Sequence, residues 1–378
     1  MTSTLETATK GLEGVVANES AICNVLGIEG RLIYRGYEIQ DLVEHTSFEE
    51  TAYLLLNGDL PKRDQLKTFT TDLKGARKID RVVQRVLREA PASAPPMSVL
   101  RTAVSAAVFT DPDAADHSRE SEYRKAVRLI AQLPTMLATF HRLRRNERPL
   151  APRRGLSHAG NFLYMLSGQM PSVGTERAMD VALIVHADHE LNASTFAARV
   201  TAATLADMHG AVTAAIATLA GPLHGGATAE VMKMLLTIAT PERAESWARD
   251  TLARKQRVMG FGHRVYRTTD PRASLLRALA AELGRAAGQP QWAAIQQILE
   301  EFMKRERGLF SNVDFYSAPM YYVMGIPLDL FTPIFALSRV SGWCAHVLEQ
   351  HADNRLIRPR AEYTGSMNRR WVSLRKRG

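Results

Sequence analysis

Hydrophobic residues recur every three or four positions along most of the chain, which is the spacing of amphipathic α-helices. Helix boundary residues frame four of these segments. The first predicted helix follows the capping box of Ser47 and Glu50 and runs through TAYLLLN to Gly58, and the second runs from Pro61 to Gly75. The third begins at Asp270 and Pro271 ahead of RASLLRALAAELGRAAG, and the fourth covers QWAAIQQILEEFMKRER up to Gly308. We therefore expect an almost wholly α-helical protein.

Strand-like segments are scarce. The clearest is AICNVLGIEGRLIYRG, in which two short apolar runs flank Glu29 and Gly30, and it predicts a small β-hairpin. An alanine-rich run over residues 211–222 is too short to span a membrane and predicts a buried helix. The segments around Pro95 and Pro241 indicate turns or helix starts. Composition alone marks no domain boundary along the chain.

Composition narrows the class of protein. With 378 residues, 46% of them hydrophobic, the chain can bury a large core and is expected to form more than one domain. Its two cysteines, Cys23 and Cys344, exclude a disulfide framework or a cysteine metal cluster and fit a reducing compartment. The first 14 residues carry no basic segment followed by an apolar run, so no secretion signal is expected. A cytoplasmic protein without membrane spans is therefore predicted.

The charge balance allows two classes of anionic partner. The net charge is +9 with a pI near 9.7, and basic clusters occur at residues 142–148 and 375–377. No zinc-finger or RNA-recognition signature accompanies them. A positive field also suits dicarboxylates and phosphorylated cofactors. We expect small polyanions rather than nucleic acid, with a basic binding protein as the alternative.

The segment HADHELNAST, residues 186–195, places two histidines beside two carboxylates. We expect His186 and His189 on one helical face, with Asp188 and Glu190 next to them. A shared metal ion is one interpretation, and it would suit a metal-dependent hydrolase, although neither HExxH nor the EF-hand pattern is present. The other interpretation is that His186, which follows the apolar run VALIV, is a core histidine.

Two glycine-bearing segments each carry a histidine. In GPLHGG, residues 221–226, His224 is expected at a sharp bend before a helix, where backbone N–H groups favour a neutral imidazole or a nearby anion. In GFGHRVYRTTDPR, residues 260–272, glycines permit close backbone approach to a ligand near His263, and Arg267 and Arg272 suit carboxylates or phosphates. A structural turn and a helix start with incidental charges are the alternatives.

Three further polar residues interrupt apolar surroundings. Asp314 precedes Phe315 and Tyr316 in SNVDFYSAP, so burial would raise its pKa and make it a better base, unless it is a helix N-cap. Arg339 lies within the apolar LFTPIFALSRVSGW and requires an anion from the protein or from a ligand. Arg358, beside Pro359, is either a ligand contact or a surface residue.

Together these residue types suit one reaction. Removing a proton next to a thioester carbonyl requires a base such as Asp314 and a donor such as His224 to stabilise the enolate. Condensing the enolate with a ketone requires a second donor on the ketone oxygen, such as His263. A dicarboxylic keto acid requires several cations, for which Arg272, Arg339 and Arg358 are candidates.

HADHELNAST, GPLHGG, GFGHRVYRTTDPR, NVDFYSAP, FTPIFALSRVSGW and RLIRPRAEYTG occur in the order and spacing of the citrate synthase family, which the whole chain resembles. The resemblance implies an all-α homodimer whose protomer has a large helical domain, residues 1–224 and 319–378, and a small helical domain, residues 225–318. These domains are expected to close over oxaloacetate. The chain looks like the compact dimeric type, without the N-terminal extension of longer, NADH-regulated hexameric members.

The resemblance also implies roles for individual residues. The catalytic residues would be His224, His263 and Asp314, with Ser194 at the position of the family's serine. The substrate carboxylates would be bound by His189, Arg272, Arg339 and Arg358, the last from the partner subunit. Coenzyme A would border Arg257, Val258, Met259, Gly260 and Phe261, and its phosphates would meet Arg267. Acetyl-CoA is the expected cosubstrate, with no metal and no tightly bound cofactor. A 2-methylcitrate synthase that uses propionyl-CoA is the alternative.

Overall fold

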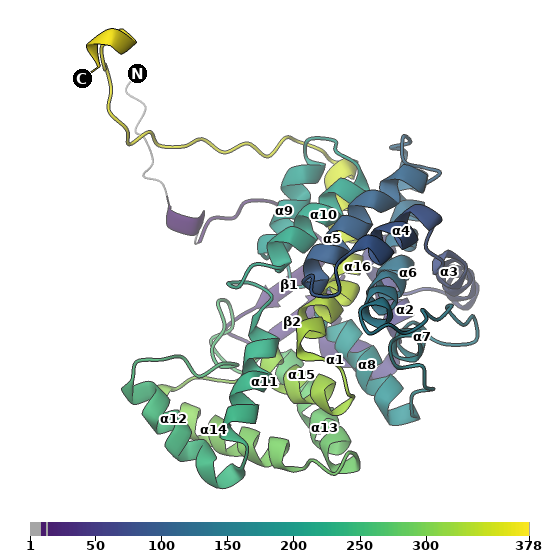
Figure 1. Cartoon of the computed structure of the whole chain (residues 1–378), viewed down its shortest axis with the longest axis vertical. Helices are drawn as coiled ribbons and strands as arrows, with labels where there is room; N and C mark the ends of the chain where they lie inside the picture. The colour runs from purple at the N-terminus through teal and green to yellow at the C-terminus, as the bar shows by residue number, and fades with distance from the viewer. Residues whose placement is uncertain (1–8, 13, 378) are drawn as a thin grey trace.

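The computed structural model describes residues 9–12 and 14–377. Residues 1–8, Glu13 and Gly378 lie outside this range, and they include most of the N-terminal segment for which no secretion signal is expected. Within the described residues, helices make up most of the chain (Figure 1). The prediction of an all-α fold is therefore confirmed.

The helices follow one another with short connections. The α-helices are α1 (Ile39–His45), α2 (Phe48–Asn57), α3 (Arg63–Ala76), α4 (Arg81–Glu89), α5 (Pro96–Ala107), α6 (Arg119–Leu143), α7 (His158–Ser167), α8 (Val173–His186), α9 (Ala193–Ala202), α10 (Met208–Leu219), α11 (Ala227–Ile238), α12 (Ala244–Ala253), α13 (Pro271–Ala286), α14 (Gln291–Arg307), α15 (Val313–Val323) and α16 (Phe331–Ala352). Short 3₁₀ helices are η1 (Lys10–Leu12), η2 (Val108–Thr110), η3 (Pro241–Arg243), η4 (Leu328–Leu330) and η5 (Leu374–Lys376).

Local sequence signals explain several helix ends. Ser47 and Glu50 form the predicted capping box, since each side chain accepts the backbone N–H of the other residue. Gly58 and Gly308 adopt left-handed backbone conformations where α2 and α14 end. The helix α3 starts two residues after Pro61 and continues through Gly75 to Ala76, so those two predicted boundaries are slightly off.

The predicted hairpin is present, and a short strand extends it. Strands β1 (Cys23–Leu26) and β2 (Arg31–Tyr34) pair in antiparallel register from Cys23↔Tyr34 to Leu26↔Arg31, and β3 (Tyr37–Glu38) adds to β2. The hairpin turn touches a segment far along the chain, because the backbone N–H of Arg267 donates to the Gly27 carbonyl at 2.9 Å. A Cβ at position 27 would lie 2.3 Å from the Val265 carbonyl oxygen. Glycine at position 27 therefore permits this contact.

The helix α16 lies at the centre of the core. It packs against α2, α6, α8, α9 and α10, and its buried side chains include Trp343 and Arg339. The helices α11 to α15 gather at one end of the molecule, at the bottom of Figure 1. After α16 the chain runs away from the body as an extended tail that ends in η5. Among the described residues, no helix combines the length and the apolar character needed to cross a membrane.

Candidate active site

The loop after α8 corrects one prediction. The helix ends at His186, so His189 lies in the following loop, and the two histidines do not share a helical face. Tertiary contacts take the chain out of the helix, because the Ala187 carbonyl accepts from the Gly342 N–H and the Asp188 carbonyl accepts from the Tyr34 hydroxyl.

The surroundings of His186 are those of a core side chain. Its Nδ1 lies 2.7 Å from the Ala182 carbonyl, and its ring packs edge-on against Phe335. This geometry favours the core interpretation of His186 over the metal interpretation. Among the described residues, no three His, Cys, Asp or Glu side chains are grouped so that they could hold a metal ion.

The start of α9 connects three elements of the site. Asn192 caps the helix by accepting the backbone N–H groups of Ser194 and Thr195, each at 3.1 Å. The Ser194 hydroxyl lies 2.7 Å from the Asn192 side-chain oxygen and receives the indole N–H of Trp343 at 3.2 Å. Neither Asn192 nor Trp343 is among the site residues predicted from the sequence. The Asn-x-Ser-Thr pattern before a helix signalled the cap, whereas the Trp343 contact depends on the tertiary fold.

His224 lies in the turn before α11, two residues ahead of the N-cap Gly226. Its Nε2 faces the Ser194 backbone N–H at 3.2 Å and the Ser194 hydroxyl at 2.9 Å. A backbone N–H can only donate, so this contact assigns the acceptor role to Nε2 and leaves the proton on Nδ1. Burial, reinforced by the charge of Arg339, lowers the pKa of His224 to about 4. The imidazole is therefore neutral at pH 7 and has one N–H to donate.

The glycine turn at residues 260–262 is held against the start of α15. The Gly260 carbonyl accepts the Asn312 N–H, and the Gly262 N–H donates to the Phe310 carbonyl, both at 2.9 Å. Gly260 has a φ of 85°, and a Cβ there would lie 2.7 Å from the Phe315 ring. Both the backbone conformation and the packing therefore require glycine at position 260.

His263 follows this turn and has a defined protonation pattern. Its Nδ1 accepts the backbone N–H groups of Val265 and Tyr266 at 3.0 and 3.1 Å, so the proton resides on Nε2. Burial and, next, the Arg272 charge lower the pKa of His263 to about 4. The ring lies 5.2 Å from that of His189, centroid to centroid, and the Nε2 of His189 is buried without a partner among the described residues.

Arg272, in the first turn of α13, is held in a fixed orientation. Asp270, the N-cap of that helix, accepts from Arg272 Nε at 3.0 Å and from Nη2 at 2.8 Å. The same carboxylate accepts the Val313 N–H at 3.2 Å, which joins the start of α13 to the start of α15. Because Asp270 satisfies one edge of the guanidinium, Arg272 keeps its charge in a buried position.

Arg339 is a buried cation with one unsatisfied group. Its Nε donates to the His186 carbonyl at 2.7 Å, and its guanidinium lies over the Phe335 ring at 4.6 Å. Its Nη2 has no hydrogen-bond partner among the described residues, although the side chain is only 1% exposed. Burial lowers the pKa of Arg339. The charge of the Asp188 carboxylate opposes this shift and meets part of the predicted need for an anion, while Nη2 remains available to a ligand.

Asp314 is the second residue of α15, and Asn312 is the N-cap, so the capping interpretation does not apply to Asp314. Its Oδ1 accepts the hydroxyl of Thr228, from the first turn of α11. Burial raises the pKa of Asp314 despite that hydrogen bond. Contacts thus link the segments of His224 to Ser194, of His263 to His189, and of Asp314 to α11, a few residues after His224.

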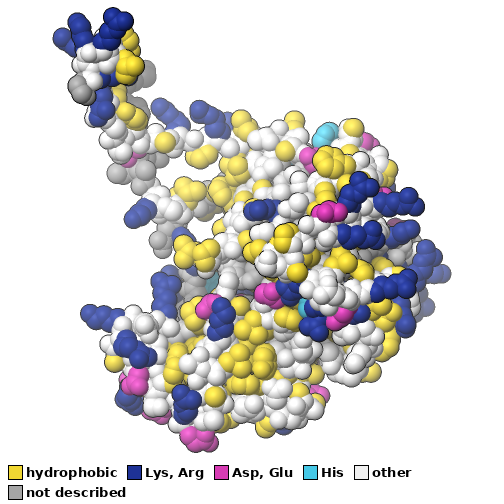
Figure 2. Space-filling model, viewed as in Figure 1, with side chains coloured by type: hydrophobic (Ala, Val, Ile, Leu, Met, Phe, Trp, Pro, Cys, Tyr) yellow, Lys and Arg dark blue, Asp and Glu magenta, His cyan; other side chains and the backbone are white. Residues whose placement is uncertain are grey.

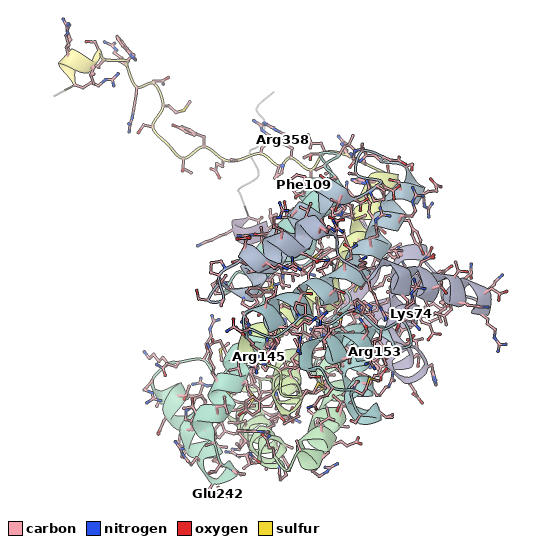
Figure 3. The ribbon with its side chains drawn as sticks, turned by 45° about the vertical axis from the view of Figure 1, so that its right-hand side comes forward. Lys74, Phe109, Arg145, Arg153, Glu242 and Arg358 are labelled. Atoms are coloured by element: carbon pink, nitrogen blue, oxygen red, sulfur yellow. The ribbon has the colours of Figure 1, made fainter. Side chains whose placement is uncertain are left out.

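The structure does not bring Arg358 to these residues. It lies on the exposed tail beyond α16, away from the body of the protomer (Figure 3).

The expected coenzyme A residues differ in exposure. Arg257 and Arg267 are exposed and form no ion pair among the described residues, whereas Val258 is buried and Phe261 packs on Phe315 at 4.7 Å. Met259 is partly buried and packs against the core. Only part of this set can therefore meet a ligand through side chains.

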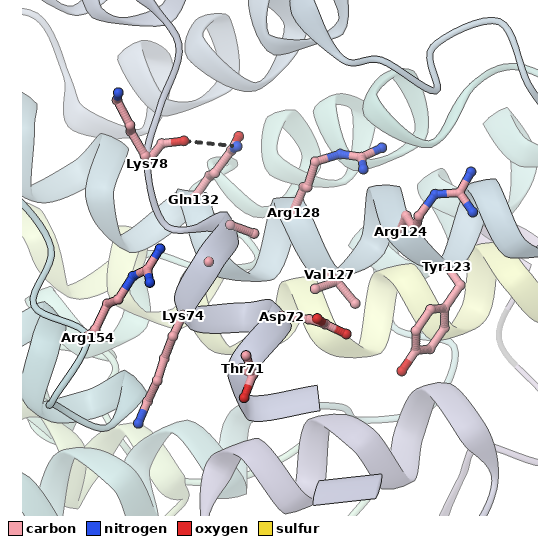
Figure 4. A pocket seen from close by; sticks show the side chains of 12 residues that line it. Thr71, Asp72, Lys74, Lys78, Tyr123, Arg124, Val127, Arg128, Gln132 and Arg154 are labelled. Atoms are coloured by element: carbon pink, nitrogen blue, oxygen red, sulfur yellow. Dashed lines mark hydrogen bonds between the residues drawn. The ribbon is translucent and has the colours of Figure 1, made fainter. Parts of the chain in front are cut away.

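A separate groove of about 700 Å³ lies between α3 and α6 (Figure 4). Its lining includes the basic side chains Lys74, Lys78, Arg124, Arg128 and Arg154, and Figure 2 shows Lys and Arg side chains gathered along the right-hand edge of the molecule. Arg128 pairs with Asp111 and Asp113, and Arg124 pairs with Asp113. These pairs neutralise the two arginines, and none of the candidate site residues lines the groove.

The basic cluster at residues 142–148 is likewise largely paired. Arg142 and Arg145 contact Glu147, and Arg144 contacts Asp329. These arginines therefore do not form a continuous positive patch of unpaired charges.

Comparisons with known proteins agree on one family. The family model described as "Citrate synthase, C-terminal domain" matches residues 11–360. The citrate synthase of Haloferax volcanii is 49% identical over 362 residues, covering 94% of this chain and 95% of the relative. Citrate synthase 2 of Bacillus subtilis is 46% identical and covers 98% and 100%. The 2-methylcitrate synthase of Mycobacterium tuberculosis is 42% identical and covers 95% and 91%.

Solved structures agree as well. Citrate synthase from Pyrobaculum aerophilum superposes with a TM-score of 0.92 at 40% identity, over 97% of this chain and 95% of that one. A citrate synthase from Thermoplasma acidophilum, in a ternary complex with carboxymethyl coenzyme A and oxaloacetate, superposes with a TM-score of 0.92 at 33% identity. That match covers 98% of this chain and 100% of the neighbour.

Proposed function

The chain belongs to the citrate synthase family, and from this premise we propose that it condenses acetyl-CoA with oxaloacetate and hydrolyses the product to citrate and coenzyme A. The observation that carries the proposal is the combination of two neutral imidazoles, each with one N–H to donate, and a carboxylate whose pKa is raised. A base and two donors are what enolate formation and attack on a ketone require.

Oxaloacetate binds first in this proposal. The unsatisfied Nη2 of Arg339, the fixed guanidinium of Arg272 and the unpartnered Nε2 of His189 supply positive charge and donors for its carboxylates. The neighbour that binds oxaloacetate together with a coenzyme A analogue supports a dicarboxylate as the ligand. Arg358 completes the site from the partner subunit of a homodimer, because its own protomer holds it on an exposed tail.

The carboxylate of Asp314 removes a proton from the acetyl methyl group, and the Nδ1–H of His224 donates to the thioester oxygen as the enolate forms. Ser194 keeps His224 in the required orientation and tautomer. The raised pKa of Asp314 strengthens it as a base, since burial disfavours the charged form that it loses on protonation. Neutral His224 has a single N–H, on Nδ1, and donates through it.

The enolate carbon then attacks the oxaloacetate ketone, while the Nε2–H of His263 donates to the ketone oxygen. A carbon–carbon bond forms as the ketone π bond breaks, and the oxygen becomes the citrate hydroxyl. Water then cleaves the thioester, which releases citrate and the coenzyme A thiol. Atoms balance as acetyl-CoA, oxaloacetate and water on one side and citrate, coenzyme A and one proton on the other.

Coenzyme A passes along the segment at residues 257–261. Gly260 keeps the backbone close to Phe315, and the exposed cations Arg257 and Arg267 are available to phosphates. Val258 contributes through its backbone because its side chain is buried. The enzyme uses coenzyme A as a cosubstrate, with no metal and no tightly bound cofactor in the reaction.

Closure of a small domain, residues 225–318, over the large one excludes water after oxaloacetate binds. The second boundary falls inside α15, so the hinge on that side belongs after the helix, near Gly325, which has a φ of 76°.

Two buried free thiols, Cys23 and Cys344, are compatible with a reducing cytoplasm.

A second candidate function is 2-methylcitrate synthesis from propionyl-CoA, which the relative from Mycobacterium tuberculosis favours. One additional methylene changes discrimination by only about 1–3 kcal/mol in an apolar pocket, so the same catalytic groups suit either donor. We propose acetyl-CoA as the preferred donor, as in the relatives from Haloferax volcanii and Bacillus subtilis.

The test is a steady-state assay of thiol release with oxaloacetate and either acetyl-CoA or propionyl-CoA. We expect turnover with both and a higher kcat/KM for acetyl-CoA. A preference for propionyl-CoA would select the second candidate function. Absence of turnover with both donors would reject a citrate synthase. A hydrolytic activity that is lost on chelation would then favour a metal-dependent hydrolase.

A further inference from the structure

Tyr266 contacts both histidines that face the proposed keto acid. Its ring lies 4.7 Å from the His263 ring and 5.6 Å from the His189 ring, measured between centroids, in tilted and edge-on geometries. Its backbone N–H donates to the Nδ1 of His263 at 3.1 Å. Tyr266 therefore sets the His263 tautomer together with Val265 through their backbone N–H groups, and it packs on two imidazoles through its ring.

The hydroxyl of Tyr266 is buried and has no hydrogen-bond partner among the described residues, although the side chain is only 3% exposed. A buried hydroxyl without a partner costs free energy, so hydrogen bonds within the described residues do not explain a tyrosine here. The contacts that the structure shows for this side chain are those of its ring. This separates a role for the ring from a role for the hydroxyl.

The backbone around Tyr266 is fixed from both sides. The Arg267 N–H donates to Gly27 in the hairpin turn, and the Val265 carbonyl packs directly on Gly27. On the other side, the Val265 N–H is bound to His263. The backbone that carries the ring is consequently anchored both to the hairpin and to His263.

We propose that the ring of Tyr266 is a positioning element for the reaction, wedged against His189 and His263 so that both imidazoles keep the angle at which they meet the keto acid. The inference rests on the proposed function, because it assigns a purpose to the orientation of those two rings. Tyr266 itself does not touch the reacting atoms in this account.

Removing the ring would also change the solvation of the imidazoles. His263 is faced by Arg272 and Asp270 from the start of α13 and by His189 from the loop after α8, and Arg339 of α16 also acts on His189. Water in place of the ring would weaken the desolvation that keeps His263 neutral. Its ionisation would then move from about 4 toward the ordinary value for histidine, near 6.5.

The experiment compares Tyr266→Phe, Tyr266→Leu and Tyr266→Met. The Phe variant keeps the ring, and we expect its kcat and its oxaloacetate KM to stay within about twofold of the parent enzyme, because the lost hydroxyl has no partner. The Leu and Met variants lack the ring, and we expect the oxaloacetate KM to rise by about 10- to 100-fold. The acidic limb of their kcat/KM profile should move toward neutral pH.

Two controls separate positioning from general packing. Tyr53→Leu removes one ring of a comparable edge-on pair, Tyr53 with Phe69 at 5.5 Å, away from the site, and should lower the melting temperature without changing the oxaloacetate KM. Calorimetric titration with oxaloacetate follows binding without turnover. It therefore distinguishes failure of this inference from failure of the proposed function.

Equal losses in the Phe and Leu variants would overturn the proposal, because the hydroxyl would then be the important group. An unchanged KM and pH profile in folded Leu or Met variants would overturn it as well. Should either variant fail to fold, the other and the Phe variant still decide the question. Weaker oxaloacetate binding by the ring-less variants supports the positioning role even in an enzyme without citrate formation.

Discussion

Single side chains in the site owe their chemistry to burial. His224 and His263 are neutral because desolvation lowers the pKa of each to about 4, and Asp314 is a stronger base because desolvation raises its pKa. Each histidine has one nitrogen occupied by a backbone N–H, which leaves the other as a donor. Environment thus assigns different roles to chemically similar groups.

Replacing Asp314 with Asn should disable proton abstraction. We expect kcat to fall by about 10²- to 10⁴-fold, the usual contribution of general acid–base catalysis. Oxaloacetate affinity should be nearly unchanged, because other residues bind the keto acid. Thiol release gives kcat and calorimetry gives the oxaloacetate Kd; an equal collapse of both would contradict the role of Asp314. Thr228→Val, which removes only the hydrogen bond to Asp314, is the milder companion variant.

The pH dependence should report Asp314 rather than a histidine. As pH falls, Asp314 is protonated at a pKa above the ordinary value near 3.9 and can no longer accept a proton, so kcat/KM should decline there. His224 and His263 stay neutral down to about pH 4 and add no limb between pH 5 and 8. A limb centred near pH 6.5 in the wild-type profile would show that an imidazole titrates at its ordinary value.

The residues that carry charge or a proton were predictable from sequence because they interrupt apolar runs or follow glycines. Their partners were not. The Thr228 hydroxyl meets Asp314 across a long stretch of chain, and Trp343 reaches Ser194 from another helix. His189 was placed on a helix because HADHELN continues a helical pattern, whereas contacts from α16 and β2 end the helix first.

At the scale of elements, α16 depends on one close approach. A Cβ at Gly342 would lie 2.3 Å from Asp188 Oδ1 and 2.4 Å from the Ala187 carbonyl oxygen. The Gly342 N–H also donates to that carbonyl at 3.1 Å. This glycine therefore holds α16, with Arg339 and Trp343, against the loop that carries His189.

Gly342→Ala should destabilise the protein and impair the site together. We expect a loss of about 1–3 kcal/mol from overpacking, with a raised oxaloacetate KM because Arg339 shifts. The matched control is Gly75→Ala, in a helix and without neighbours within 4 Å of the added Cβ, which should gain up to about 1 kcal/mol. Urea unfolding and oxaloacetate titration check both variants, and a neutral Gly342→Ala would refute the tight packing.

Helix caps and the hairpin were accessible from local sequence, because Ser47 with Glu50 and the Glu29-Gly30 turn act through neighbours in the chain. The short strand β3 was not predicted. Two residues without an alternating pattern give no strand signal, and they pair only because β2 offers a free edge.

At the scale of the whole molecule, the proposed homodimer would complete each site with the exposed tail of the partner subunit. Arg358 lies on this tail beyond α16, away from the body of the molecule (Figure 3). The fold class followed from helical spacing over the whole chain, and the confirmed family followed from the order of six motifs. The proposed assembly of two protomers has no comparable pattern in the sequence, since periodicity reports which residues are buried and not which chain buries them.

Mixing Asp314→Asn and Arg358→Ala subunits tests that division. Each homodimer should be almost inactive, whereas a mixed dimer has one site with an intact Asp314 and an Arg358 from the neighbour. Refolding the two together should restore about a quarter of wild-type activity for random pairing in a two-fold dimer. If the mixture stays inactive while size-exclusion chromatography shows dimers, Arg358 acts within its own chain.

The contact between the hairpin turn and residues 265–267 has a consequence for biosynthesis. The hairpin leaves the ribosome early, and its partner segment is made much later, so the loop that carries His263 gains its support only after most of the chain exists. Recovery of oxaloacetate binding during refolding should therefore lag behind recovery of helical circular dichroism. We therefore expect enzymatic competence to arise late in the life of each newly made chain.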